Sequence, residues 1–133
     1  MVLIDTSIWI NVFKDKQGSY ANGLSREIDG RDIVLTRFQQ LELLQGCRNE
    51  SEWQKLSEYL AGQEYLEMRP ATWQTAARVY YDLRKRGITV RSAIDCCIAQ
   101  IAIENRVLLI HDDRDFSAIG DYYPLQQQRW TGL

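Results

Sequence analysis

The sequence predicts an α/β fold, a three-layer α/β/α sandwich with a central, mostly parallel sheet. Short apolar segments rich in β-branched residues alternate with longer segments of helical periodicity, which is typical of strands joined by helices. The length of 133 residues suits one domain. No linker, repeat or low-complexity tract interrupts the chain, so we expect a single domain over residues 1–133.

The first half of the chain contains five expected elements. In order they are a strand at 2–4, a helix at 6–14, a strand at 32–35, a helix at 36–46 and a helix at 51–62. Thr36 and Gln39 have the spacing of a capping box, and Gly46 is typical of a helix end. These signals place a helix directly after the second strand.

The second half contains the remaining elements. They are a strand at 64–68, helices at 70–87 and 92–105, a strand at 106–110 and a weak edge strand at 123–128. Pro70 suits a first helical turn and Gly87 suits a helix end.

Composition excludes several classes of protein. The formal net charge is −2, so any nucleic-acid partner must be recognised by a local patch. Cys47, Cys96 and Cys97 form neither a disulfide framework nor a CxxC pair, which favours reduced thiols and a cytoplasmic location. No signal peptide is evident, and the aliphatic runs are far shorter than the roughly 20 residues of a membrane span, so we expect no membrane association.

Acidic residues follow two of the predicted strands. Asp5 comes directly after the strand at 2–4, and Asp112, Asp113 and Asp115 follow "RVLLIH". Because ligands collect at the carboxyl ends of parallel strands, these carboxylates are expected at one edge of the sheet.

Two helical acids add to this set. Asp95 shares a stripe with Ile98, Ala99 and Ala102, where a carboxylate is costly unless it is paired or bound to metal. Glu42 lies on a partly apolar face, so we expect it to point toward the body of the domain.

Each acid also has a purely structural interpretation. Asp5 suits a helix N-cap, Asp95 could complete a capping box with Ser92, Glu42 could be half-exposed, and "DDRD" could be a polar turn. If the acids converge instead, two carboxylates ~4 Å apart repel by about 4 kcal/mol at an effective dielectric of 20. Several such pairs require a positive counter-charge. With His111 as the only histidine, all-oxygen ligands favour Mg²⁺ or Mn²⁺.

These segments resemble the PIN domain family. "VLIDTSIWI", "LELLQG", "VRSAIDCCIAQIAIEN" and "LLIHDDRDF" occur in the order of that family's motifs, over roughly residues 2–120. The match is most similar to the VapC-like toxins of toxin–antitoxin pairs. The resemblance implies a Mg²⁺-dependent endoribonuclease, hydrolysing RNA with a metal-activated water and inhibited by a cognate antitoxin. It also suggests a homodimer.

The resemblance also implies roles for particular residues. The family's acidic quartet corresponds to Asp5, Glu42, Asp95 and Asp113, with Asp5, Asp95 and Asp113 as metal ligands. Thr6 resembles the hydroxyl residue that supports the first acid. Asp115 is the other candidate for the fourth acid, serving as a helix cap and an outer support, whereas Asp112 is expected to point into solvent.

Cationic residues between 78 and 91 have two interpretations. Arg84, Arg86 and Arg91 could contact RNA phosphates, or they could simply complement a helix C-terminus. We expect no chemical role for His111 and mainly packing or interface roles for the tryptophans.

Two other functions remain open. A metal-dependent phosphatase with an aspartyl nucleophile would resemble "DxD" after the first strand, whereas this chain has "DTS". A non-catalytic RNA- or protein-binding regulator would not need the acidic quartet. Assays of RNA cleavage beside a phosphatase substrate distinguish these possibilities.

Overall fold

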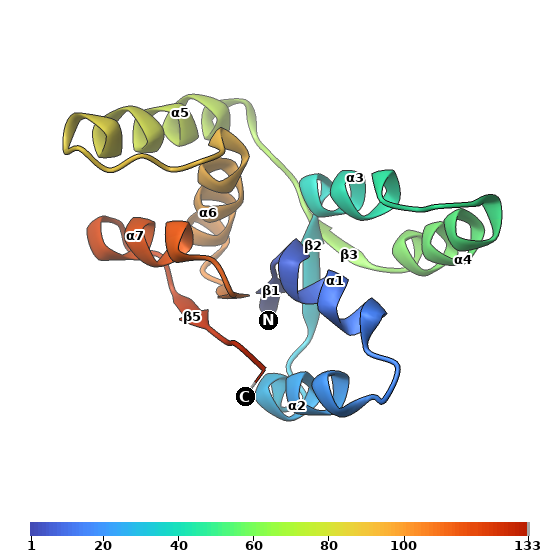
Figure 1. Cartoon of the computed structure of the whole chain (residues 1–133). Coiled ribbons are helices and arrows are strands. Elements are labelled where there is room, and N and C mark those ends of the chain that lie inside the picture. Colours follow the sequence, from blue (N-terminus) through green and yellow to red (C-terminus); the bar gives the residue numbers. More distant parts are fainter. Residues whose placement is uncertain (133) are drawn as a thin grey trace.

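The computed structural model describes residues 1–132 and contains a five-stranded sheet in the order β3-β2-β1-β4-β5 (Figure 1). All four strand pairs are parallel. The strands are β1 (Val2–Ile4), β2 (Ile33–Thr36), β3 (Glu64–Leu66), β4 (Leu108–His111) and β5 (Gln127–Arg129). The predicted α/β architecture is therefore confirmed, and the edge strand expected at 123–128 is present but spans Gln127–Arg129. Leu133, the end of the predicted domain, lies outside the described residues.

Helices cover both faces of this sheet. They are α1 (Thr6–Lys14), α2 (Ser19–Ile28), α3 (Arg37–Gln45), α4 (Glu50–Ala61), α5 (Pro70–Lys85), α6 (Ala93–Asn105) and α7 (Arg114–Tyr122). The fully buried strand β1 shows how the layers form, because successive side chains of a strand face opposite sides. Val2 and Ile4 pack in a core with residues of α1–α4, whereas Leu3 packs in a second core with residues of α5–α7.

Two helices, α2 and α7, are missing from the sequence-based prediction; for α7 the sequence indicated only a helix cap at Asp115. Helix α2 has an apolar stripe of Tyr20, Leu24 and Ile28, but Gly23 and several serine and asparagine residues give the segment low intrinsic helix propensity. Gly18 begins the helix with a φ of 81°, a conformation open to glycine. Packing of Leu24 and Ile28 into the core therefore stabilises a helix that local propensity leaves marginal.

The start of β4 also differs from the prediction. Arg106 ends α6 with a φ of 54°, and the backbone N–H of Val107 still donates to the carbonyl oxygen of Ala102. These contacts keep 106 and 107 at the helix end, so the strand begins at Leu108 and extends through His111.

The parallel strands bring three chain reversals to one edge of the sheet. Asp5 follows β1, Arg37 follows β2 and Asp112 follows β4. The backbone N–H of Asp5 donates to the carbonyl oxygen of Ile110 at 2.9 Å, which ties the ends of β1 and β4 together. None of the described helices has the length and apolarity that a bilayer span requires.

Candidate metal centre

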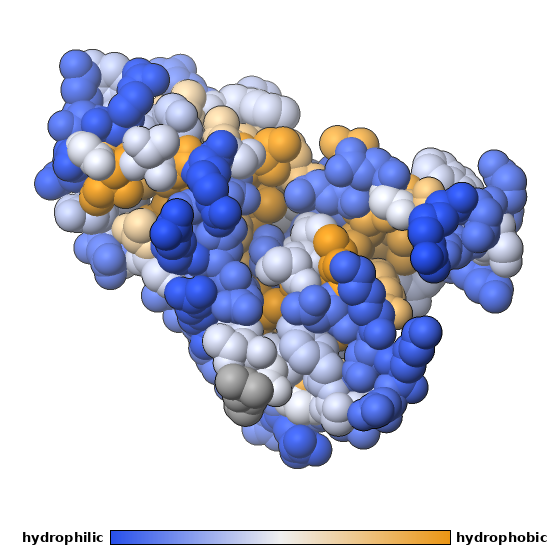
Figure 2. Space-filling model, viewed as in Figure 1, coloured by the Kyte–Doolittle hydropathy of each residue, from blue (hydrophilic) through white to orange (hydrophobic). Residues whose placement is uncertain are grey.

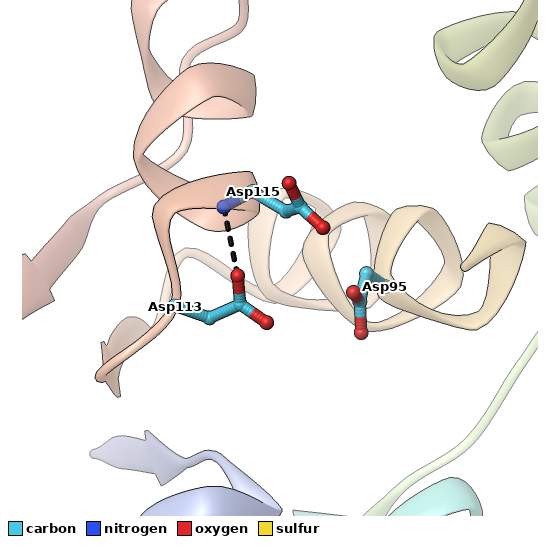
Figure 3. Close-up of side chains that lie close together, drawn as sticks. All are labelled: Asp95, Asp113 and Asp115. Carbon is cyan, nitrogen blue, oxygen red and sulfur yellow. Dashed lines mark hydrogen bonds between the residues drawn. The ribbon is translucent and has the colours of Figure 1, made fainter. Parts of the chain in front are cut away.

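Three carboxylates from two helices and the turn between β4 and α7 form the centre of the acidic site. Asp95, Asp113 and Asp115 each offer an oxygen, and these oxygens lie within 4.8 Å of one another. Asp95 comes from the first turn of α6, Asp115 from the first turn of α7, and Asp113 directly precedes α7 (Figure 3). The residues are separated by up to 20 positions in sequence, so packing of α6 against α7 brings them together.

Asp113 is held in place by contacts to its backbone and its side chain. It is the N-cap of α7, and its Oδ1 accepts from the backbone N–H of Asp115 at 2.9 Å (Figure 3). The backbone N–H of Asp113 donates to Nδ1 of His111 at 3.0 Å. His111 is fully buried, and its Nε2 lies 2.7 Å from Oε1 of Gln127 on β5. The imidazole therefore carries its proton at Nε2, and a chain of contacts from the sheet edge orients Asp113.

Arg91 is the cation in contact with this centre. Its backbone N–H and its Nε both donate to Oδ2 of Asp115, at 3.1 and 2.9 Å, and its Nη2 donates to Oδ1 of Asp113 at 2.7 Å. Charge-assisted contacts of this kind fix both geometry and charge. Arg91 therefore balances part of the negative charge and joins the loop before α6 to the start of α7.

Asp95 has no such partner. Among residues 1–132 it makes no ion pair, and burial raises the pKa of its carboxyl to about 7, with further increases from Asp5, Asp113, Asp115 and Glu42. The cap of α6 is Ser92, whose hydroxyl accepts from the backbone N–H of Ile94 at 3.2 Å. The structural interpretation of Asp95 as part of a capping box is therefore not needed to explain this helix start.

Asp5 and Glu42 form the other side of the site. Asp5 caps α1, and its Oδ2 accepts from the hydroxyl of Ser7 at 2.7 Å and from the backbone N–H of Ser7 at 3.3 Å. The hydroxyl of Thr6 donates to Oε1 of Glu42 at 3.3 Å. Burial raises the pKa of Glu42, and the charge of Asp5 raises it further. Asp5 and Glu42 are thus electrostatically coupled, although neither belongs to the closest group of three.

The position of Glu42 depends on a buried glutamine. Gln39, on α3, accepts at Oε1 from the backbone N–H of Thr36 at 2.8 Å, as the predicted capping box requires. Its Nε2 donates to the carbonyl oxygen of Ile4 at the end of β1. Gln39 therefore links the start of α3 to β1, one turn before Glu42.

Several sequence-based expectations differ from the observed contacts. Thr6 supports Glu42, whereas Ser7 supplies the hydroxyl on Asp5. The α7 cap is Asp113, not Asp115. Asp112 lies outside the group of three, but it pairs with Nε of Arg129 at 3.0 Å instead of standing free in solvent. The contacts of Thr6 and Asp112 differ because their partners, Glu42 and Arg129, are distant in sequence and only the tertiary structure brings them together.

The predicted cations also separate into two groups. Arg91 binds the acids, whereas Arg84 and Arg86 lie at the end of α5 beside tyrosine rings. His111 has a structural role that the sequence alone does not reveal. The only advance signal is its position between a buried strand and an acid, and its partner Gln127 is distant in sequence.

The ligand chemistry of the site fits a hard divalent cation. The converging donors are carboxylate oxygens, which suit Mg²⁺, Mn²⁺ or Ca²⁺. Both ring nitrogens of His111 are engaged in hydrogen bonds, and burial raises the pKa of the neighbouring Cys96 thiol to about 12. Neither the imidazole of His111 nor the thiol of Cys96 is therefore available as a metal ligand. A cation would neutralise the uncompensated negative charge around Asp95.

Comparison with solved structures supports the fold. VapBC2 from Rickettsia felis bound to a promoter DNA fragment aligns with a TM-score of 0.77 and 20% identity, covering 98% of this chain and 100% of that one. VapBC-1 from nontypeable Haemophilus influenzae aligns with a TM-score of 0.76 and 23% identity, covering 98% of each chain. At these identities the comparisons show a shared fold.

Sequence comparison extends the relationship. The PIN domain model matches residues 2–122. VapC ribonuclease Mb1587 of Mycobacterium bovis is 32% identical over 130 residues, covering 95% of this chain and 96% of that protein, and ribonuclease VapC11 of Mycobacterium tuberculosis matches to the same extent. Because the match spans nearly the whole chain and includes the segments that carry the acids, the predicted resemblance is confirmed, and the chain belongs to the PIN domain family.

Proposed function

We propose that this protein is a Mg²⁺-dependent endoribonuclease and the toxin of a toxin–antitoxin pair. The observation that carries the proposal is the convergence of Asp95, Asp113 and Asp115 beside Asp5 and Glu42, in a PIN domain related to VapC ribonucleases over nearly its full length. The proposed unit is one PIN-like domain over residues 1–133.

The proposed ligands are Asp5, Asp95 and Asp113. Asp95 and Asp113 belong to the closest group of carboxylates, and Asp5 is near enough to raise the pKa of Asp95. When bound, Mg²⁺ would lower the pKa of a coordinated water and stabilise negative charge on the phosphate undergoing attack. Mn²⁺, which also prefers oxygen ligands, is expected to substitute.

The protein's own residues supply orientation and proton transfer. Glu42 has a raised pKa, a half-buried carboxyl and the Thr6 hydroxyl on one oxygen, so its other oxygen is suited to accept a proton from the attacking water. Asp115 acts mainly as a positioning residue, because its Oδ2 is occupied by two N–H groups of Arg91. Arg91 in turn holds Asp113 by Oδ1.

The proposed protein partners are a cognate antitoxin and a second copy of this chain. An acidic site that must stay inactive invites a basic antitoxin segment, because arginine can engage carboxylates through two N–H groups. Exposed apolar side chains, including Phe13, Leu41 and Trp73, offer surface for protein contacts outside the site. Co-expression with the product of the adjacent gene should suppress both RNA cleavage and growth arrest, and the homodimer should be visible by light scattering.

The decisive experiment measures cleavage of a labelled RNA and a phosphatase substrate by the purified protein. Cleavage of RNA is expected with Mg²⁺ or Mn²⁺, and none in chelator. The variant Asp95→Asn should lose at least 100-fold in activity, the scale on which electrostatic contributions act. Asp29→Asn is the matched control, since Asp29 is exposed at the end of α2, where Asn tolerates its φ of 53°.

Three outcomes would contradict the proposal. Undiminished RNA cleavage in chelator, by a preparation shown free of contaminating nuclease, would contradict the metal mechanism. Equal activity of folded Asp95→Asn and Asp29→Asn would show that the acidic group has only a structural role. Turnover of the phosphatase substrate without RNA cleavage would favour the phosphatase interpretation.

A further inference from the structure

A second group of polar side chains lies at the end of the molecule where α5 and α7 finish. Arg84 and Lys85 end α5, Arg86 is its C-cap, and Tyr122 ends α7. A pocket of about 550 Å³ is lined by Asp82, Lys85, Arg86, Tyr122 and Tyr123. We call the group Arg84, Lys85, Arg86, Tyr81 and Tyr122 the α5–α7 end surface.

The charge of this surface is largely uncompensated. Arg84, Lys85 and Arg86 are exposed and form no ion pair within residues 1–132. The acid inside the pocket, Asp82, is already paired with Arg78 at 2.9 Å and accepts from the hydroxyl of Tyr123. Helix-end cations complement the helix dipole, but that effect does not require three consecutive cations.

Exposed aromatic rings accompany these cations. Tyr122 is 48% exposed and Tyr81 is 40% exposed. The guanidinium of Arg86 lies 5.0 Å from the ring centre of Tyr122, and Lys85 Nζ lies 5.4 Å from that of Tyr81. Single-stranded nucleic acid is bound by such a combination, because cations contact phosphates while bases stack on aromatic rings or guanidinium planes.

Three consecutive cations that form no ion pair among the described residues favour RNA over a protein partner, since arginine and tyrosine alone would suit either. Lysine is depleted at the centre of protein–protein interfaces, where unpaired cations would lose water without compensation. Among the large exposed apolar or aromatic side chains, Phe13, Leu41 and Trp73 belong to α1, α3 and the first turn of α5, whereas those at the α5–α7 end surface are the tyrosines Tyr81 and Tyr122. In Figure 2, strongly hydrophilic side chains frame a more apolar area at the end of the molecule where Figure 1 shows α5 and α7 ending.

Helix α7 connects this surface to the acidic site. Asp115 lies in the first turn of α7 and Tyr122 at its last residue. At 1.5 Å per residue, the seven intervening steps correspond to roughly 10 Å along the helix axis. One flexible RNA strand can therefore contact both places at once.

We propose that the α5–α7 end surface binds the single-stranded RNA segment that flanks the phosphate to be cut. Lys85 and Arg86 contact backbone phosphates, and an unstacked base packs against Tyr122 and the guanidinium of Arg86. This inference rests on the proposed ribonuclease function and adds a substrate-binding surface to it. The surface contributes affinity for the RNA but no group to the cleavage step.

The test compares RNA binding and cleavage by wild type and three sets of variants. Binding of a labelled single-stranded RNA is measured in chelator over a series of salt concentrations. Lys85→Gln/Arg86→Gln should weaken binding and lower the slope of log affinity against log salt by about 1.4, the value for two contacts to a single strand. Tyr122→Ala should weaken binding at least fivefold, on the scale of one stacked base, whereas Tyr122→Phe should retain it. With Mg²⁺, the double variant should show a raised KM and an unchanged kcat.

The matched control is Lys14→Gln/Lys16→Gln, which removes the same charge from exposed cations beyond the other face of the sheet. Thermal melts verify folding of every variant. Equal weakening by both double variants would show that net charge alone acts, and would overturn the inference. Unchanged binding and KM with an altered oligomeric state would identify a protein contact instead, and would also overturn it. If folded, Mg²⁺-supplied wild type neither binds nor cleaves RNA, the proposed function itself fails.

Discussion

The backbone N–H of Asp113 donates to Nδ1 of His111, and the other ring nitrogen of His111 meets Gln127 on the neighbouring strand. This contact links the orientation of an acid in the site to the edge of the sheet. A side chain expected from sequence to have no chemical role thus determines where the β4–α7 turn places its carboxylate. It also requires one particular tautomer of a fully buried imidazole.

Replacing His111 should therefore loosen Asp113. His111→Leu leaves the N–H of Asp113 without its acceptor, at a cost of about 1–3 kcal/mol in the free energy of unfolding. Affinity for Mg²⁺ or Mn²⁺, measured by calorimetry, should fall as well. Gly120→Ala is a second route to the same network, because its Cβ would lie 2.9 Å from Cγ of Gln127. Unchanged metal affinity in both folded variants would show that His111 serves only the core.

The stability of the protein should depend on pH through Asp95. Its pKa is about 7 when folded against 3.8 normally, so the unfolded state loses this proton first as pH rises. The free energy of unfolding therefore falls as pH rises from about 4 to 7 and stays lower above pH 7. The total loss is at most ~4 kcal/mol. Solvent screening of the half-buried carboxyl lowers that figure.

The variant Asp95→Asn removes this charge and tests the relationship. In chelator, its free energy of unfolding in urea should exceed that of wild type at pH 8, and the difference should vanish near pH 3.5. Adding Mg²⁺ should stabilise wild type at pH 8 but not the variant. A difference that is constant across pH would mean that Asp95 does not titrate in this range.

The three acids after β4 should separate by role. Asp113→Asn keeps a residue that can cap α7 but loses the charge, so activity should fall while stability is nearly retained. Asp113→Ala loses both, and should cost about 1 kcal/mol more in stability. Thermal melts and cleavage rates of this pair separate the cap from the charge.

The neighbouring acids complete the series. Activity should fall less for Asp115→Asn than for Asp113→Asn, because Asp115 acts through Arg91. It should fall least for Asp112→Asn, which loses only a half-exposed ion pair with Arg129. Loss of activity in Asp112→Asn beside an active Asp113→Asn would show that the wrong acid has been assigned to the metal.

The hydroxyls of Thr6 and Ser7 should influence different carboxyls. The Thr6 hydrogen bond lowers the pKa of Glu42, so Thr6→Val should raise that pKa further. Ser7→Ala removes the 2.7 Å contact to Asp5 and should leave the direct contact between Thr6 and Glu42 intact. Carboxyl-carbon NMR titrations of the two variants measure this directly. An equal shift of Glu42 in both would contradict the assignment of the hydroxyls.

Much of the fold follows from local sequence patterns. Apolar segments of strand length, helical periodicity and end signals such as Pro70 and the Thr36–Gln39 pair predict most elements, because each pattern reports burial or backbone preference within a few residues. Helices α2 and α7 are the exceptions. Packing of Leu24 and Ile28 stabilises α2, and packing of Phe116 and Ile119 stabilises α7.

The sequence by itself also determined that acids follow β1 and β4 and that Asp95 lies on an apolar helical face. Only the tertiary structure decided which acids meet and which side chain holds each one. Arg91 reaches Asp115 across 24 positions and Gln127 reaches His111 across 16. Such pairings depend on how α6, α7 and β5 pack, and on competition among several donors for the same carboxylate. Neither helical nor strand periodicity encodes that competition, because periodicity reports which face a side chain occupies and not what it meets there.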